Sequence, residues 1–231
     1  MAGNEVLQAR WNRLRAAHKA DLPALTAARA REFLKEFPEG GPAWKILGSA
    51  LIDLARYPEA ELAIKKALSL CPPEKLWIPL TEMGHLCKAR GDYNSAAAWY
   101  RQAIEAVPRE ASGHIYLGGV LAKSGRLKEA EASLRAATLC IEGCRDEAFL
   151  NLGLVLRAQE RYEEAAECFE RALELDPKYA AAKKALRDVR RALRFLLKGT
   201  PRKRGRPPII PPLPEKSRSE SPGAPGLAAA M

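Results

Sequence analysis

The chain has 231 residues, of which 47% are hydrophobic and 29% charged, and its formal net charge is +10. No segment approaches the ~20 apolar residues that cross a bilayer, and no secretory signal is visible. We therefore expect a soluble cytoplasmic protein without a membrane partner, or a nucleoid-associated or nuclear one if its basic end directs it there. Five cysteines, an odd number without zinc-ligand spacing, predict reduced thiols and no metal site.

The positive charge is concentrated near the end of the chain. Residues 1–177 include 24 basic and 25 acidic residues, whereas residues 178–206 include 12 basic residues and 1 acidic residue. The last segment, 207–231, has 2 of each. Such one-sided charge indicates an acidic partner for one short region of the protein.

Residues 1–40 predict a degenerate pair of helices. Trp11 and Leu14 mark the first helix. Pro23 begins the second, because proline is tolerated in the first turn of a helix, and Pro38 ends it. We expect this pair to cap the N-terminal end of the segment that follows.

Residues 41–177 repeat one pattern four times. Each copy predicts two short helices, since apolar and small residues recur in it at helical spacing. The copies are marked by recurring glycines, Gly48, Gly84, Gly118 and Gly153, which are 36, 34 and 35 residues apart. The clearest copy runs from Asp146 to Pro177 and breaks at Gln159-Glu160-Arg161.

The small residues of each copy have a packing role. Gly48, Ala60 and Ala67 let the helix axes approach closely, so that large neighbours such as Ile64 fill the gaps. A single pair of helices cannot bury its own apolar face. Neighbouring copies must therefore stack into a curved solenoid with a concave and a convex side.

In these copies the chain resembles the tetratricopeptide repeat (TPR) family, whose pattern is W-x2-L-G-x2-Y, then A-x3-F and a closing P over about 34 residues. The first copy matches at Trp44, Leu47, Gly48, Ala60, Ala67 and Pro72, while Leu51 replaces the tyrosine and Ala55 the usual turn glycine. The resemblance implies an all-α fold, a right-handed helix-turn-helix solenoid.

In this family the first helix of each pair faces a concave groove that holds a protein or peptide ligand. The resemblance implies a groove lined by Lys45, Ile46, Ser49, Ile52, Glu82, His85, Ile115, Tyr116, Leu150, Asn151, Leu154 and Arg157. The apolar members would anchor an amphipathic or extended peptide. Alternatively, several of them pack between adjacent helices.

One subtype of the family holds the acidic C-terminal tails of chaperones in a clamp of lysine, asparagine and arginine. Lys45 matches the clamp lysine, but Ser49, Glu82, Ser112 and Tyr116 stand at other clamp positions. Because Glu82 would repel an acidic tail, we do not expect this subtype.

No catalytic arrangement is visible in the sequence. His18, His85 and His114 are scattered, and none has an adjacent nucleophile at an interpretable spacing. The glycines belong to the repeats and do not form a phosphate-binding loop. We therefore expect a protein that is not an enzyme and has no cofactor.

Residues 178–198 predict a helix that caps the stack, with Leu186 and Val189 on its apolar face. Its other face is a basic stripe of Lys183, Lys184, Arg187, Arg190, Arg191 and Arg194. Residues 199–231 then predict a disordered tail, because Pro, Ser and Ala dominate most of it.

The start of the tail, Arg202-Lys203-Arg204-Gly205-Arg206-Pro207, resembles an AT-hook, a minor-groove element built on an R-G-R-P core. The resemblance implies that Arg204 and Arg206 lie along a narrow A/T-rich minor groove and that Gly205 lets the backbone reach its floor. A nuclear-import signal, an RNA-binding patch or a solubilising tail would have the same composition.

These observations predict a non-enzymatic adaptor whose groove holds a protein partner while residues 178–206 attach it to DNA. The first alternative is a purely protein-binding scaffold or assembly factor, whose basic tail serves localisation or weak anionic contacts. A second alternative is an accessory subunit of an enzyme complex.

Overall fold

The computed structural model describes residues 2–199, so the AT-hook-like residues Arg202, Lys203, Arg204, Gly205, Arg206 and Pro207 lie outside the part described. The helices are α1 (Ala2–Lys19), α2 (Pro23–Glu36), α3 (Gly41–Asp53), α4 (Tyr57–Ser69), α5 (Trp77–Ala89), α6 (Tyr93–Ala106), α7 (Ala111–Lys123), α8 (Leu127–Leu139), α9 (Arg145–Ala158), α10 (Tyr162–Leu175) and α11 (Ala180–Gly199). A 3₁₀ turn, Pro73–Lys75, precedes α5. The described residues contain no β-strand, and the predicted all-α fold is confirmed.

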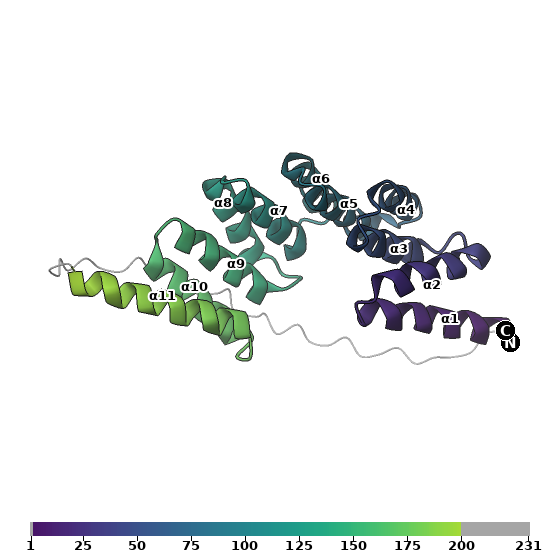
Figure 1. Cartoon of the computed structure of the whole chain (residues 1–231). Helices are drawn as coiled ribbons and strands as arrows, with labels where there is room; N and C mark the ends of the chain where they lie inside the picture. The colour runs from purple at the N-terminus through teal and green to yellow at the C-terminus, as the bar shows by residue number, and fades with distance from the viewer. Residues whose placement is uncertain (1, 200–231) are drawn as a thin grey trace, which may run out of the picture.

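Successive helices pack in antiparallel pairs, and the pairs stack into an arch (Figure 1). In Figure 1, α4, α6 and α8 lie on the outer side of the arch, and α3, α5, α7 and α9 lie on the inner side. Helices α1 and α11 lie at its two ends. None of the helices within residues 2–199 is long and apolar enough to cross a membrane.

Every pair turns through one residue in the left-handed backbone region. The turns use Asp21, Ala55, Gly91, Gly125 and Glu160, with φ of 52, 56, 81, 76 and 61°. Left-handed geometry normally favours glycine, because a Cβ crowds the following carbonyl there. Ala55 therefore adopts the conformation that the repeat requires, although it replaces the expected glycine.

The recurring glycine of each repeat lies where the first helix crosses the second. A Cβ on Gly153 would lie 2.5 Å from the Phe169 ring, far inside van der Waals contact. A Cβ on Gly48 would likewise clash with Ile64, and a Cβ on Gly118 with Leu134. The sequence-based packing argument is thus confirmed, since small residues on one helix admit large ones from its partner.

The buried apolar residues form two main clusters that meet near α5 and α6. One cluster runs from Leu14 on α1 to Leu86 on α5. The other runs from Cys87 on α5 to Val189 on α11. The half-buried Trp99 on α6 packs against both clusters.

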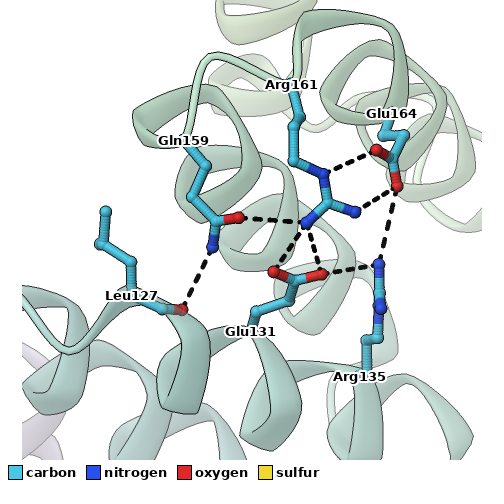
Figure 2. Close-up of polar contacts among 6 residues, drawn as sticks. All are labelled: Leu127, Glu131, Arg135, Gln159, Arg161 and Glu164. Carbon is cyan, nitrogen blue, oxygen red and sulfur yellow. Dashed lines mark hydrogen bonds and ion pairs between the residues drawn. The ribbon is translucent and has the colours of Figure 1, made fainter.

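A polar network joins α8 to the start of α10 in the next pair (Figure 2). Arg161 Nη1 donates to both carboxylate oxygens of Glu131, at 2.7 and 2.8 Å, and Arg135 pairs with Glu131 at 2.7 Å. Arg161 also donates to Glu164, and Gln159 Nε2 donates to the Leu127 carbonyl oxygen at 3.3 Å. Burying Glu131 is tolerated because two guanidinium groups compensate its charge.

Candidate functional site

The inner helices carry the residues that were expected to line the groove, but they do not expose all of them. Lys45, Ser49, Ile52, His85, Tyr116, Asn151 and Leu154 are half-buried, and Arg157 is exposed. Ile46, Ile115 and Leu150 are only 7, 3 and 8% exposed, so they pack between helices. The apolar stripe is therefore narrower than expected and consists mainly of Ile52, Tyr116 and Leu154.

Lys45 on α3 and Glu82 on α5 form an ion pair across adjacent inner helices. The Lys45 Nζ atom lies 3.0 Å from Glu82 Oε1, and the Glu82 side chain is only 9% exposed. The lysine that matches the chaperone-tail clamp is thus already bound to a carboxylate of its own chain. An acidic tail would have to compete with Glu82 for it.

Beside this pair, His85 and two tyrosines form an aromatic cluster. His85 Nδ1 and the Tyr100 hydroxyl are hydrogen-bonded at 2.8 Å, and the His85 and Tyr116 rings meet edge to face at 4.6 Å. Burial, then the charges of Lys88 and Lys45, lowers the pKa of His85 to about 4. The imidazole is therefore neutral at pH 7 and links α5 to α6 and α7.

A small cavity of about 460 Å³ lies next to His85, between α3 and α5. It is lined by Ser49, Ile52, Asp53, Glu82, His85, Lys88 and Ala89. Burial, reinforced by the charge of Lys123, lowers the pKa of Lys88. Several residues predicted from the sequence, Ser49, Ile52, Glu82 and His85, thus come together around one hollow.

A larger cavity of about 830 Å³ was not predicted. It lies between α1 and the start of α3, and it is bounded by the end of α4, the loop after it and the start of α5. One signal for it was present in the sequence: the interval from Gly48 to Gly84 is 36 residues, the longest of the three. The extra length lies in the loop that holds Pro73–Lys75, which borders this cavity.

Burial raises the pKa of the thiols of Cys71 and Cys87, which keeps them protonated at neutral pH. Within the part of the chain that the structure describes, no group of three His, Cys, Asp or Glu side chains could hold a metal ion.

Helix α11 has a buried face and a basic face, as its sequence predicts. Ala182, Leu186 and Val189 are buried against the preceding pair. The predicted nucleic-acid contacts Arg187, Arg190, Arg191 and Arg194 are all exposed. Arg190 pairs with Glu170 at 2.8 Å, and the Arg191 guanidinium lies 6.0 Å from the centre of the Phe195 ring.

Comparison with known proteins agrees with this architecture. The chain is 29% identical over 133 residues to the human tetratricopeptide repeat protein 7B, a match that covers 58% of this chain and 15% of that protein. The chain therefore spans only a small part of this relative.

Two solved structures are similar to this fold. A tetratricopeptide repeat protein from Parabacteroides merdae superposes with a TM-score of 0.64 at 21% identity, over 79% of this chain and 70% of that one. YrrB, described as a TPR protein with an unusual peptide-binding site, superposes with a TM-score of 0.50 at 21% identity, over 74% and 87% of the two chains.

Family profiles locate the repeats directly. Tetratricopeptide repeat profiles match residues 12–75, 81–142 and 146–179, which together make up well over half of the chain. These segments cover most of α1 to α10. The chain therefore belongs to the tetratricopeptide repeat family.

Proposed function

We propose that this protein is a non-enzymatic TPR scaffold whose inner surface holds a segment of a protein partner. The observation that carries the proposal is the pair of cavities, about 830 and 460 Å³, bounded largely by the terminal helix α1 and the inner helices α3 and α5. Grooves that combine apolar side chains with a few polar groups are typical peptide sites. The peptide-binding site described for YrrB adds support from a protein of the same fold.

Site-specific crosslinking tests this part of the proposal. A photo-reactive residue replaces Ser49 or Asn151 on the inner surface in the full chain, and a matched control replaces Leu62, which is 69% exposed on the outer helix α4. We expect both inner positions, and not Leu62, to capture the same protein in cells. Equal capture from all three positions would show that the inner surface is not selective.

The second part of the proposal assigns DNA attachment to the basic end. The arginines of α11 support it, since only Arg190 among Arg187, Arg190, Arg191 and Arg194 forms an ion pair within the described residues. Unpaired arginines on one helix face are suited to phosphate contacts. In this proposal Arg204 and Arg206 add preference for an A/T-rich minor groove.

Duplex binding by the full chain tests the attachment. We expect tighter binding to an A/T-rich than to a G/C-rich duplex of equal length, and loss of that preference in the Arg204→Ala/Arg206→Ala double variant. Equal affinity of the wild type for the two duplexes and for heparin would instead favour the purely protein-binding scaffold, with a tail that makes weak anionic contacts.

A further inference from the structure

The N-terminal pair departs from the packing of the rest of the array. From α3 onward, each inner helix contacts the next inner helix, in the sequence α3–α5, α5–α7 and α7–α9, and α9 contacts α11. Helices α1 and α3 pack together far less closely, and the cavity of about 830 Å³ lies between them. This space is therefore a feature of one position in the array.

The floor of this cavity is apolar. Trp11 from α1, Ile46 from α3, Leu70 after α4 and Ile78 from α5 line it. Pro42, Pro72 and Pro79 add apolar surface without free backbone N–H groups. Such a lining favours a large apolar side chain from a ligand. When that side chain binds, its own apolar surface and the apolar floor of the cavity are both removed from water.

The rim of the same cavity has one sign of charge. Arg15, His18, Lys19, Lys45 and Lys75 line it, and no aspartate or glutamate does. Lys45 pairs with Glu82, whereas Arg15, Lys19 and Lys75 form no ion pair within the described residues. A concave site with unpaired cations of this kind raises the local concentration of acidic ligands.

We propose that this cavity, in an inference that rests on the scaffold function above, binds an acidic segment of the partner protein anchored by a large apolar side chain. The anchor enters the apolar floor, and flanking aspartates or glutamates pair with Arg15, Lys19 and Lys75. The chain's own residues 200–206 are a poor occupant, because their arginines and lysine carry the same charge as the rim.

Three labelled 12-residue peptides test the chemistry on the full chain by fluorescence anisotropy. The first has leucine and phenylalanine anchors among glutamates, the second replaces each glutamate with lysine, and the third replaces each anchor with serine. We expect the first peptide to bind at least tenfold more tightly than the other two. Its affinity should fall as salt is added, because salt screens the charge pairs. Failure of the first peptide to bind, or equal binding of all three, overturns the inference.

Variants locate the binding. The double variant Arg15→Glu/Lys19→Glu should lower the affinity for the acidic peptide at least tenfold. The control Lys128→Glu, a charge reversal on the exposed surface of α8, should leave that affinity unchanged. These side chains are exposed, so circular dichroism should show intact folding in each variant. Ala16 lies at an exposed position on the cavity wall, and Ala16→Trp should lower the affinity for the acidic peptide because the indole ring fills part of the cavity.

Thiol labelling gives a second, positional measurement. Cys71 lines the cavity, whereas Cys144 is exposed in the loop before α9. We expect the acidic peptide to slow alkylation of Cys71 severalfold and to leave Cys144 unchanged. If Ser49 still captures a partner while Cys71 is not protected and Arg15→Glu/Lys19→Glu has no effect, this inference fails and the scaffold function stands. If Ser49 captures nothing selectively, the scaffold function itself fails.

Discussion

Gly84 and Tyr100 lie so close together that a Cβ on Gly84 would be 2.3 Å from the Cε1 atom of Tyr100. The absent side chain lets the Tyr100 ring lie between α5 and α6 and reach His85 with its hydroxyl group. Tyr100 is fully buried, so its ring has little room to move away. The glycine thus shapes both the packing of this repeat and the polar cluster on its inner side.

Gly84→Ala should therefore destabilise the protein by roughly 1–3 kcal/mol, the usual range for forcing extra volume into a packed core. The measurement is chemical denaturation followed by circular dichroism. Gly119→Ala on α7 is the matched control, because a Cβ there meets nothing within 4 Å. It should stabilise the protein by ~0.5–1 kcal/mol through helix propensity. Equal effects of the two variants would contradict the packing argument.

Acid should weaken the fold through His85. Its folded pKa of about 4 lies below its ordinary value of 6.5, so the unfolded chain binds a proton there that the folded chain does not. This contribution is complete above about pH 6.5 and is lost as pH falls toward 4, up to roughly 3 kcal/mol. Unfolding free energies of wild type and His85→Gln at pH 7 and pH 4.5 measure it.

The difference between those two proteins isolates the histidine from the carboxylates that also titrate in acid. His85→Gln should lose less stability than wild type on going from pH 7 to pH 4.5. The same pH dependence in both proteins would mean that the environment formed by Lys45, Lys88 and Tyr100 does not hold the imidazole neutral.

The network in Figure 2 should contribute measurably because Glu131 is largely buried, with 11% of its side chain exposed. Glu131→Gln removes the carboxylate charge that faces Arg161 and Arg135, and it should destabilise the protein by about 1–3 kcal/mol. Glu129→Gln on the same helix is the control, since Glu129 pairs with Arg126 at the surface. There we expect little change, because water screens exposed pairs. Thermal unfolding of both variants at the same salt concentration measures the two changes in stability, and equal changes would contradict this prediction.

Phosphate binding by α11 should be visible in the salt dependence of DNA affinity. Arg187→Ala/Arg191→Ala in the full chain should lower the slope of log affinity against log salt by about 0.9 for each phosphate that the helix no longer neutralises. The A/T preference should remain, because these arginines lie on the helix and not in the AT-hook-like core. An unchanged slope would show that α11 does not bind the DNA backbone.

The sequence predicted the helix pairs because glycine spacing and apolar periodicity are local properties of the chain. It left open whether Ile46, Ile115 and Leu150 line the groove or pack between helices, because a helix face assigned by resemblance does not fix how far each side chain is covered by its neighbours. The large cavity was not predicted either, because the long interval from Gly48 to Gly84 indicates extra loop length but does not place α1. It depends on where α1 lies relative to α3, and neither helix encodes that distance in its own residues.

The two apolar clusters meet at Trp99 on α6, which divides the arch into two halves. The helices on each side of Trp99 are held mainly by their own apolar cluster. A partner segment that contacts both halves would hold them at one angle and so fix the curvature of the arch. Without such a partner we expect the two halves to separate before either core unfolds, which the fluorescence of Trp99 would report in a chain whose Trp11, Trp44 and Trp77 are replaced by phenylalanine.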